Sequence, residues 1–531
     1  MPKMKLLFKL FCFSILFNGS AKLYAQQVLL GGTDMLDEQY RNLQLLGSGN
    51  KNSSFTLRPF FHSDSSTTNT QSTRIKILPM VLNQQYNTFA PYGWNDGAMI
   101  PAKGYQALIS GGLFAQMGKF SLQLRPEIVF AANPDYERFP VSETDDAKYL
   151  RTVYLNQADM PERFGNKSFQ RVYLGQSSFR WNHKSVSVGL SNENLWWGPG
   201  VRNSLIMSNH APGFMHFTAN TTKPLQTKIG SFEGQLIAGR LEESGFKHDS
   251  KNFMAYGTNW EEPKPQDWRY ISGVTLNYQP KWVPGLFVGI NRVFQIYRGD
   301  MGNGLGDYFP ILSPFQKKNT KNEDAKKRDQ LASVFFRWKF EESKSEIYFE
   351  YGRNDHAMSF WDFFESAEHS RAYLLGFRKV FWLNQSKSRY LKINLEHTQM
   401  QQSEDRYLRP PDSWYLHYQV KHGYTHRGEL LGAGIGPGSN LQTFDLSIWE
   451  PDRILGFQLE RYLHNQDYFF RTYNDYRRKW ADLMFNTYAY RRYGNLGVQV
   501  RLNAAWIRNY QWQLYNNKLN MQFYTSLMYH F

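Results

Sequence analysis

LNMQFYTSLMYHF, residues 519–531, is the last stretch of the chain and decides its fold. Alternate residues from Leu519 to Phe531 are apolar or aromatic apart from Thr525, and most of the residues between them are polar. Side chains of a strand point alternately to its two faces, so the pattern predicts one apolar and one polar face. A barrel removes an exposed edge by pairing its last strand with its first. We therefore predict that Phe531 ends the closing strand of an outer-membrane β-barrel. A strand of a soluble sandwich is the alternative.

Residues 1–25 have the features of a secretory signal peptide. Three lysines among the first nine residues precede the apolar run 10–17, which is too short to span a membrane. Ala25 offers a cleavage point. The chain's one cysteine, Cys12, lies within this peptide. We therefore expect an exported mature chain without a disulfide, a catalytic thiol or a cysteine-ligated metal.

The composition favours a barrel over a helical membrane protein. Aromatic residues make up 17% of the chain, yet mean hydropathy is −0.58 and no apolar run of helical membrane-spanning length follows the signal peptide. Barrels combine these properties because lipid-facing residues alternate with polar lumen residues and aromatic girdles mark both interfaces. The formal net charge is +16. A basic exported protein can attract an acidic polysaccharide or anionic lipid headgroups, and export argues against nucleic acid.

The pattern along the chain divides it into three parts. Residues 26–100 are expected to form an N-terminal periplasmic or plug-like helical segment and a lead-in, with a helix that begins near Asp34 and ends at Gly47. Residues 101–531 are expected to form the barrel. Strand alternation without intervening helices predicts an all-β, antiparallel transmembrane barrel of roughly 16 to 20 strands.

Four hairpins are predicted from alternation and turn residues. They are Tyr105–Met117 with Phe120–Phe130, the run Val172–Ser191 turning at residues 182–184, residues 332–340 with 347–351, and residues 496–506 with the final strand. Long polar stretches at 133–168, 298–330 and 401–427 are expected to be loops. The middle loop carries a lysine cluster that includes Lys317 and Lys318, interpreted either as a solvated loop or as a cationic surface for an anionic glycan.

The stretch NENLWWGPGVRNSLIMSNHAPGFMHF, residues 192–217, holds the candidate functional residues. The Gly-Pro-Gly run breaks a strand abruptly and is predicted to leave the two tryptophans at a rim or in the lumen. Flat aromatic faces beside polar groups suit a sugar-binding surface, although one ring could be an interface anchor and the other a packing residue. The candidate glycan-binding residues are Glu193, Asn194, Trp196, Trp197, Arg202, Asn203 and Asn209, together with Lys317 and Lys318.

This stretch resembles the Wzi family of capsule-assembly proteins. The likeness is carried by Trp-Trp-Gly-Pro-Gly at 196–200 with the runs at 204–206 and 208–209, and by further runs at 40–46, 55–59 and 432–440. The resemblance implies a barrel of about eighteen strands with a small N-terminal helical element on the periplasmic side. It also implies a non-enzymatic, lectin-like role in which the protein holds capsular polysaccharide, expected to be anionic, at the cell surface. Outer-membrane lipid and the outer-membrane assembly machinery are the other expected partners.

Two other function classes remain open at this point. The first is an anion-selective or substrate-specific porin, with lumen residues such as Arg125 and Arg501 selecting the solute. The second is an outer-membrane hydrolase with Glu193 and Glu233 as candidate carboxylates. The 13 histidines show no metal-binding spacing, and the glycine-rich runs lack the ending of a phosphate loop, so no metal or cofactor is expected.

Overall fold

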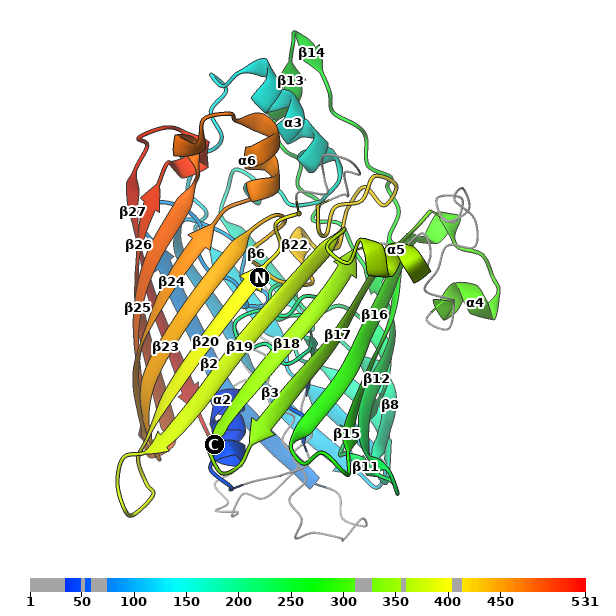
Figure 1. Ribbon diagram of the computed structural model, residues 1–531, viewed down its shortest axis with the longest axis vertical. Coiled ribbons are helices and arrows are strands. Elements are labelled where there is room, and N and C mark those ends of the chain that lie inside the picture. Colours follow the sequence, from blue (N-terminus) through cyan, green and yellow to red (C-terminus); the bar gives the residue numbers. More distant parts are fainter. Residues whose placement is uncertain (1–33, 49–52, 59–73, 311–326, 355–359, 404–412) are drawn as a thin grey trace, which may run out of the picture.

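Eighteen antiparallel strands close into a barrel in the computed structural model (Figure 1). The structure describes residues 34–48, 53–58, 74–310, 327–354, 360–403 and 413–531, and this count refers to them. Two of the strands are interrupted, one into β4 and β5 and one into β6 and β7. The strands are β2 (Arg74–Asn87), β3 (Gly104–Met117), β4 (Phe120–Leu124) with β5 (Glu127–Ala131), β6 (Phe169–Tyr173) with β7 (Ser178–His183), β8 (Val186–Ser191), β10 (His216–Thr221), β12 (Gly230–Leu241), β15 (Arg269–Pro280), β16 (Leu286–Tyr297), β17 (Arg328–Phe340), β18 (Ser345–Asn354), β19 (Arg371–Trp382), β20 (Tyr390–Gln399), β23 (Asn440–Glu450), β24 (Arg453–Leu463), β25 (Ala481–Tyr493), β26 (Leu496–Arg508) and β27 (Lys518–Tyr529).

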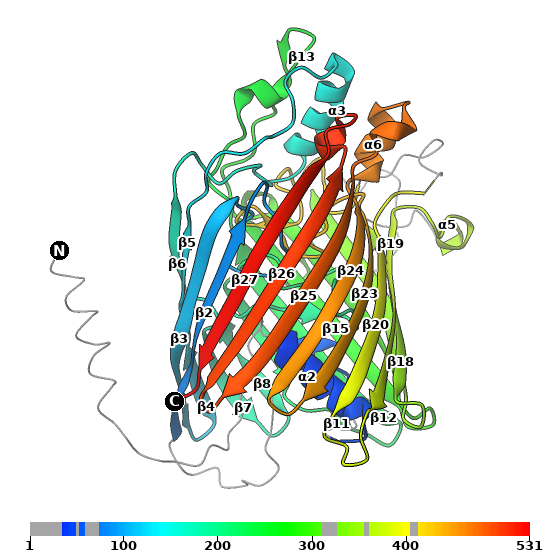
Figure 2. The same cartoon turned by 90° about the vertical axis from the view of Figure 1, so that its left-hand side faces the viewer.

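The last strand closes the barrel, as its alternation predicts. β27 pairs with β26 on one side and with β2 on the other, where Met80 faces Tyr529 and Asn87 faces Gln522 (Figure 2). Its apolar residues, such as Phe523, are exposed on the outer face, whereas Asn520 and Gln522 are buried on the inner face. The strand thus exposes its apolar face and buries its polar face. A strand of a soluble sandwich does the opposite, whereas the wall of a barrel in lipid has this pattern.

Short connections join the strands at one end and long ones at the other. The hairpins β3–β4, β17–β18 and β26–β27 confirm three of the predicted pairings. The predicted hairpin Val172–Ser191 is found in β7 and β8. Val172 lies on β6, the first part of the same interrupted strand, which pairs with β5 on its other side. The end with short turns is the periplasmic side by the usual asymmetry of outer-membrane barrels.

The barrel begins earlier in the chain than predicted. β2 belongs to it, so the predicted boundary at residue 101 is wrong, and residues 26–100 include a wall strand. Pro79 lies within β2, where the register with β3 shifts between Leu78 and Val81. Such a bulge accommodates a proline, which a regular ladder does not. The predicted signal peptide, residues 1–25, lies outside the described residues.

Helices and small sheets lie at the two ends and inside the barrel. The predicted first helix is α2, inside the barrel near the short turns (Figure 1), and Gly47 follows it with a φ of +84°. None of the described helices is long and apolar enough to cross a membrane. These elements are α2 (Asp34–Leu45), β1 (Leu57–Arg58) with β9 (Trp196–Trp197), α3 (Asp145–Asn156), β11 (Leu225–Gln226), η2 (Ser250–Phe253), β13 (Met254–Ala255) with β14 (Thr258–Asn259), η3 (Arg298–Asp300), α4 (Leu305–Tyr308), α5 (Phe360–Glu365), β21 (Thr425–His426) with β22 (Glu429–Leu430), α6 (Gln466–Thr472), η7 (Tyr476–Arg478) and η8 (Tyr510–Trp512).

Two segments of the chain fill the lumen, and we call residues 192–215 and 413–439 together the plug. Trp197 and Leu205 from the first segment and Trp414 from the second form one buried apolar cluster. The same cluster includes inward residues of wall strands on opposite sides, among them Ile271 of β15 and Met484 of β25. The plug therefore packs against the wall across the width of the barrel.

Candidate functional site

Carboxylates on the inner wall hold the segment that follows the two tryptophans. Glu396, on β20, accepts hydrogen bonds from the backbone N–H groups of residues 201–203 at 2.7 to 3.1 Å. Glu460, on β24, accepts two hydrogen bonds from the guanidinium of Arg202 at 2.8 and 3.0 Å. Gly198 has a φ of +123°, a backbone conformation that side chains rarely permit. The glycine-rich turn thus fits the chain tightly against the wall.

The two adjacent tryptophans lie inside the barrel. Trp197 is 0% exposed, and its Nε1 donates a hydrogen bond to Oε1 of Gln235 at 2.9 Å. Trp196 is also buried, with the guanidinium of Arg58 4.9 Å from the centre of its ring. Of the two predicted places, the rim and the lumen, the structure shows the lumen. There the two rings are buried packing residues, and neither offers an open face to a sugar.

The other predicted residues of this stretch also serve the interior packing. Glu193 pairs with Arg180 of β7 at 2.5 Å and accepts a hydrogen bond from Ser178 at 3.1 Å. Asn209 donates to the backbone oxygen of Asn95 at 3.0 Å. The structure thus brings together the predicted residues between 193 and 209, but in a plug and not on a surface; Lys317 and Lys318 lie outside the described residues. Buried among them are Glu193, Asn194, Trp196, Trp197, Asn203 and Asn209, while Arg202 is half-buried.

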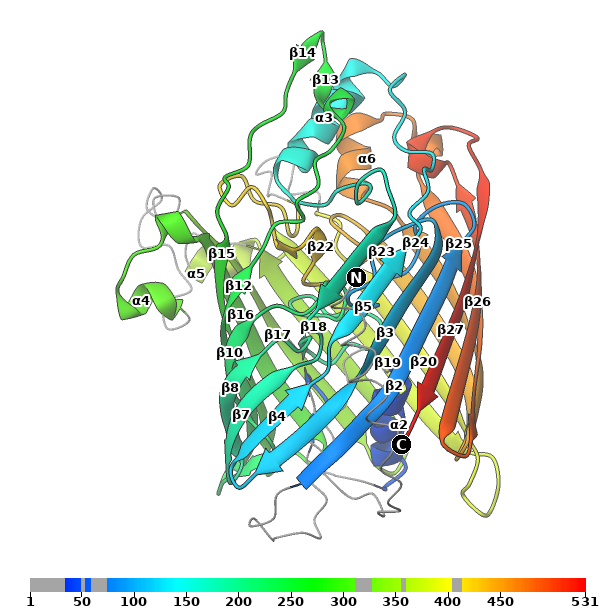
Figure 3. The ribbon, with the colours of Figure 1, turned by 180° about the vertical axis from the view of Figure 1, so that it is seen from behind.

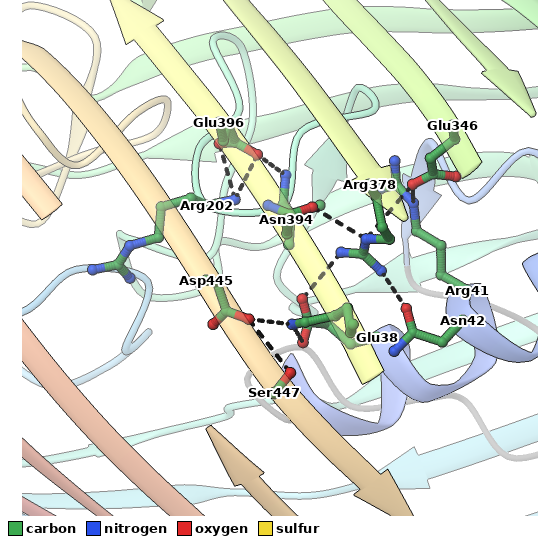
Figure 4. A network of polar contacts seen from close by, with 12 residues as sticks. Glu38, Arg41, Asn42, Arg202, Glu346, Arg378, Asn394, Glu396, Asp445 and Ser447 are labelled. Carbon is green, nitrogen blue, oxygen red and sulfur yellow. Dashed lines mark hydrogen bonds and ion pairs between the residues drawn. The ribbon is translucent and has the colours of Figure 1, made fainter. Parts of the chain in front are cut away.

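A network of buried charges docks α2 on the wall (Figure 4). Glu346, on β18, pairs with Arg41 of α2 at 2.6 Å and with Arg337 of β17 at 2.5 Å. Glu38 of α2 pairs with Arg378 of β19 at 3.0 Å. Opposite charges from the helix and from three wall strands therefore meet in the interior of the barrel. Removing Glu346 there would leave buried arginines without their partner.

At the end with long loops, α3, α6, η2, η7, η8 and the hairpin β13–β14 cover the barrel (Figure 3), and we call them the loop cap. The hydroxyl of Tyr468 on α6 donates to the backbone oxygen of Ala147 on α3 at 2.9 Å. Nδ2 of Asn156 at the end of α3 donates to the backbone oxygen of Trp260, which follows β14, at 2.8 Å. These bonds connect segments that are far apart in the sequence and fix the position of the hairpin against α3.

Three aromatic side chains are exposed together on the loop cap, and we call Tyr149, Tyr256 and Trp260 the aromatic patch. Their exposed fractions are 36%, 54% and 39%. The ring centres of Tyr149 and Trp260 are 4.8 Å apart, and those of Tyr149 and Tyr256 are 6.4 Å apart. Sequence reasoning missed this patch, because its members come from α3 and from a hairpin over a hundred residues later. Aromatic residues within polar loops were the signal available.

A hollow of about 630 Å³ lies beside the patch, between α3 and α6. Tyr154, Tyr468 and Trp512 contribute aromatic walls, and the ion pair of Arg151 with Glu162 lies in the lining. The loop cap therefore offers both exposed and recessed aromatic rings with polar groups beside them, which is the combination that sugar rings require.

The plug also contains buried histidines that are neutral in the folded protein. Burial, together with Arg269 and Lys264, lowers the pKa of His422 to about 3. Burial, with Arg427 next, lowers the pKa of His426 well below its ordinary value. Nδ1 of His426 accepts a hydrogen bond from a backbone N–H at 3.1 Å, as a neutral ring can.

We expect the plug to loosen as the pH falls below the ordinary histidine pKa of roughly 6.5. In the opened plug, His422 and His426 are exposed and bind a proton below this pH, whereas in the closed plug they stay neutral. Their contribution to the stability of the plug is therefore complete above pH ~6.5 and is lost as the pH falls toward the folded pKa values. For His422 the loss is about 2 kcal/mol between pH 6.5 and 5, and His426 adds to it in the same direction. Hydrogen exchange of peptides from 413–439 at pH 7.5 and 5, corrected for intrinsic rates, measures it. Equal protection at both values would contradict the expectation, and H422Q should reduce the difference.

The carboxylates considered for hydrolysis have structural partners. Glu193 pairs with Arg180, and Oε2 of Glu233 accepts the backbone N–H of Ser54 at 2.8 Å. These contacts attach the plug and the N-terminal segment to the wall. Within the described ranges, no group of three or more His, Cys, Asp or Glu residues is placed to hold a metal ion.

Comparisons with known proteins agree with this architecture. The family model described as capsule assembly protein Wzi matches residues 102–518. Among solved structures, the Escherichia coli protein Wzi, described as an outer-membrane protein involved in group 1 capsule assembly and as a carbohydrate-binding β-barrel, is similar in fold. It shares 13% identity, with 86% of this chain and 85% of that chain covered at a TM-score of 0.57.

Two other outer-membrane barrels match less closely. OccAB4 of Acinetobacter baumannii shares 9% identity, with 87% of this chain and 100% of that chain covered at a TM-score of 0.41. OccK7 of Pseudomonas aeruginosa shares 7% identity, with 86% of this chain and 99% of that chain covered at a TM-score of 0.40. No curated relative matches the sequence. The family match spans most of the barrel, and the chain belongs to the Wzi family of capsule assembly proteins, as an outer-membrane β-barrel.

Proposed function

We propose that this protein binds capsular or another surface polysaccharide at the loop cap and holds it at the cell surface, without a chemical step. The observation that carries the proposal is the aromatic patch, which lies on the cap of a barrel whose lumen holds the plug. Membership of the capsule assembly family supports it, and the E. coli relative is described as carbohydrate-binding. The basic net charge of +16 favours an anionic polymer.

The patch has the properties of a sugar-binding platform. Each ring offers an apolar face to the C–H groups of a sugar, and polar groups at its edge can bind hydroxyls. The hydroxyl of Tyr256 donates to Asp146 of α3, which orients its ring. Nε1 of Trp260 donates to the backbone oxygen of Ala255 at 3.1 Å, which fixes the indole. Rings held in place before binding lose little conformational freedom when a glycan arrives.

We expect the double variant Y256A/W260A to bind the polymer about 10-fold to 100-fold more weakly than the wild type, because each ring contributes about 1 kcal/mol. Surface plasmon resonance of the detergent-solubilised protein on immobilised capsule measures the affinity. Y476A is the matched control, since Tyr476 is also exposed on the loop cap but lies outside the patch. Equal affinities for wild type and double variant would remove the patch from the site.

In the cell, the same variant should release polymer into the medium while its synthesis continues. Cell-bound and free capsule, measured separately, distinguish a failure of attachment from a failure of synthesis. Capsule that remains fully cell-bound in the absence of the protein would overturn the proposal itself.

The porin alternative is less favoured by the geometry. The plug packs against opposite wall strands in one apolar cluster, and wall carboxylates bind its backbone. An open diffusion pore needs a water-filled lumen instead. The remaining partners follow from the barrel: its outer apolar face would contact membrane lipid, and the aromatic closing strand would be recognised by the outer-membrane assembly machinery during insertion.

A further inference from the structure

Two hollows lie inside the barrel, between the plug and the wall. The larger is bordered by β26, β27 and β2, and the smaller by β20 and by β23 to β26. Their volumes are about 950 and 840 Å³, and they share Asn95, Gln499 and Arg501 in their linings, so they adjoin. The larger one also reaches β3 and β5, and the smaller one reaches Met35 and Glu38 of α2. Because α2 lies near the short turns (Figure 1), the pair extends from the periplasmic end toward the middle of the barrel.

The lining of the larger hollow, which we call the inner chamber, is unusually rich in carboxamides. Asn and Gln are the commonest residues in it, and Trp94 and Tyr524 add aromatic rings. Several of its polar atoms are buried without a hydrogen-bond partner in the described structure, including Oδ1 of Asn95, Oδ1 of Asn209 and Nε1 of Trp94. A carboxamide carries both donors and acceptors, which match sugar hydroxyls that also do both. These buried polar atoms leave hydrogen-bonding capacity that water or a polar ligand can use.

Two arginines of the inner chamber have no carboxylate within ion-pair distance in the described residues. Arg125 is buried; its Nε donates to the hydroxyl of Ser110 at 3.1 Å, and its Nη1 has no partner. The guanidinium of Arg501 lies 5.7 Å from the ring centre of Tyr524. By contrast, Arg180 elsewhere in the lumen is paired with a glutamate at 2.5 Å. The carboxylates of Asp96 and Glu127 also line the chamber, and that of Glu127 attracts Arg125 from beyond ion-pair distance. Both guanidinium groups therefore still have donors to offer to a carboxylate that a ligand brings.

We propose that the inner chamber binds one acidic sugar residue of the uronate type, entering from the periplasmic end. The carboxylate lies between Arg125 and Arg501, and the hydroxyls bond to the carboxamides. Glu127, which accepts a hydrogen bond from Gln176 at 3.0 Å, can accept another from a sugar hydroxyl. The proposal rests on the proposed polysaccharide function, and it adds an interior site distinct from the aromatic patch.

The test uses the complete mature chain in detergent and isothermal titration calorimetry with glucuronate, glucose and acetate. Glucuronate should bind more tightly than the other two, and R501Q should weaken it about tenfold or more, because a charge-assisted pair is lost. R491Q is the matched control, since Arg491 lies on the neighbouring strand β25, is exposed and is outside both hollows. Arg501 is only half-buried, so its variant is expected to fold even if R125Q does not.

Each outcome decides the matter. Acetate that binds as tightly as glucuronate would reduce the site to a simple anion site and overturn sugar recognition. Absence of glucuronate binding, or binding unchanged by R501Q, would overturn the chamber as a site. The two proposals fail independently. Y256A/W260A should lose polymer affinity but keep glucuronate binding, whereas R501Q should lose glucuronate binding but keep polymer affinity.

Discussion

Replacing Glu346 by alanine is expected to lower the free energy of unfolding by roughly 3–5 kcal/mol, because it leaves buried positive charges without their partner. The carboxylate accepts a hydrogen bond from Nε of Arg41 at 2.6 Å and two from Arg337, at 2.8 and 2.5 Å. Arg378 lies 3.7 Å away. All four side chains are fully buried, so water cannot replace the lost partner. Denaturant titration of the detergent-solubilised chain, followed by tryptophan fluorescence, measures the loss.

The matched control is E450A, at the end of β23. Glu450 pairs with Arg389 at 3.2 Å, and the two side chains are 34% and 49% exposed, so the loss of this pair should cost at most about 1 kcal/mol. A cysteine introduced at Leu45, buried at the end of α2, reports whether the helix leaves the wall. Cys12 is the chain's one natural cysteine, so the additional change C12S makes thiol labelling at position 45 specific. Equal stability and labelling with and without Glu346 would show that the network does not hold α2.

The wall of the barrel could be predicted from the sequence because its signal is local. Alternation along β27 states which side chains share a face, and lipid or lumen follows from their polarity. Alternation cannot state what fills the lumen. Inward residues such as Glu396 have the same pattern whether they bind water or the backbone of residues 201–203. The sequence therefore predicted the strands around the tryptophan stretch, but it left open whether that stretch lies at a rim or in the lumen.

The aromatic patch could not be predicted, for a different physical reason. Tyr149 lies on α3, whereas Tyr256 and Trp260 come after four further wall strands in the chain: β6 with β7, β8, β10 and β12. Their proximity depends on hydrogen bonds such as that from Asn156 to the backbone of residue 260, which no periodicity reveals. Both missed features, the plug and the patch, arise from long connections, where tertiary contacts and not local patterns decide the structure.

Replacing Trp197 by alanine is expected to cost about 3–5 kcal/mol, because it leaves a cavity in the centre of the plug. The ring is 0% exposed and packs closely on the wall, because a Cβ on Gly273 of β15 would lie only 3.0 Å from it. The rigid wall strands cannot move inward to fill the cavity. Gln235 would also lose the indole donor at 2.9 Å. W197F retains most of the apolar contact and should cost less than half as much. W282A is the control, since Trp282 is 68% exposed on the turn between β15 and β16.

The same variant separates an interior role of the tryptophan stretch from a role in glycan contact. Trp197 lies within the plug, whereas Trp260 is exposed on the loop cap, so the folded fraction of W197A should bind polymer with wild-type affinity. Hydrogen exchange across residues 192–215 should rise, because Trp197 donates its backbone N–H to the oxygen of Met207 at 3.1 Å and its ring packs that turn. Loss of polymer affinity in W197A without a change in protection would instead assign the ring to the binding site, and would mean that the plug opens to admit the glycan.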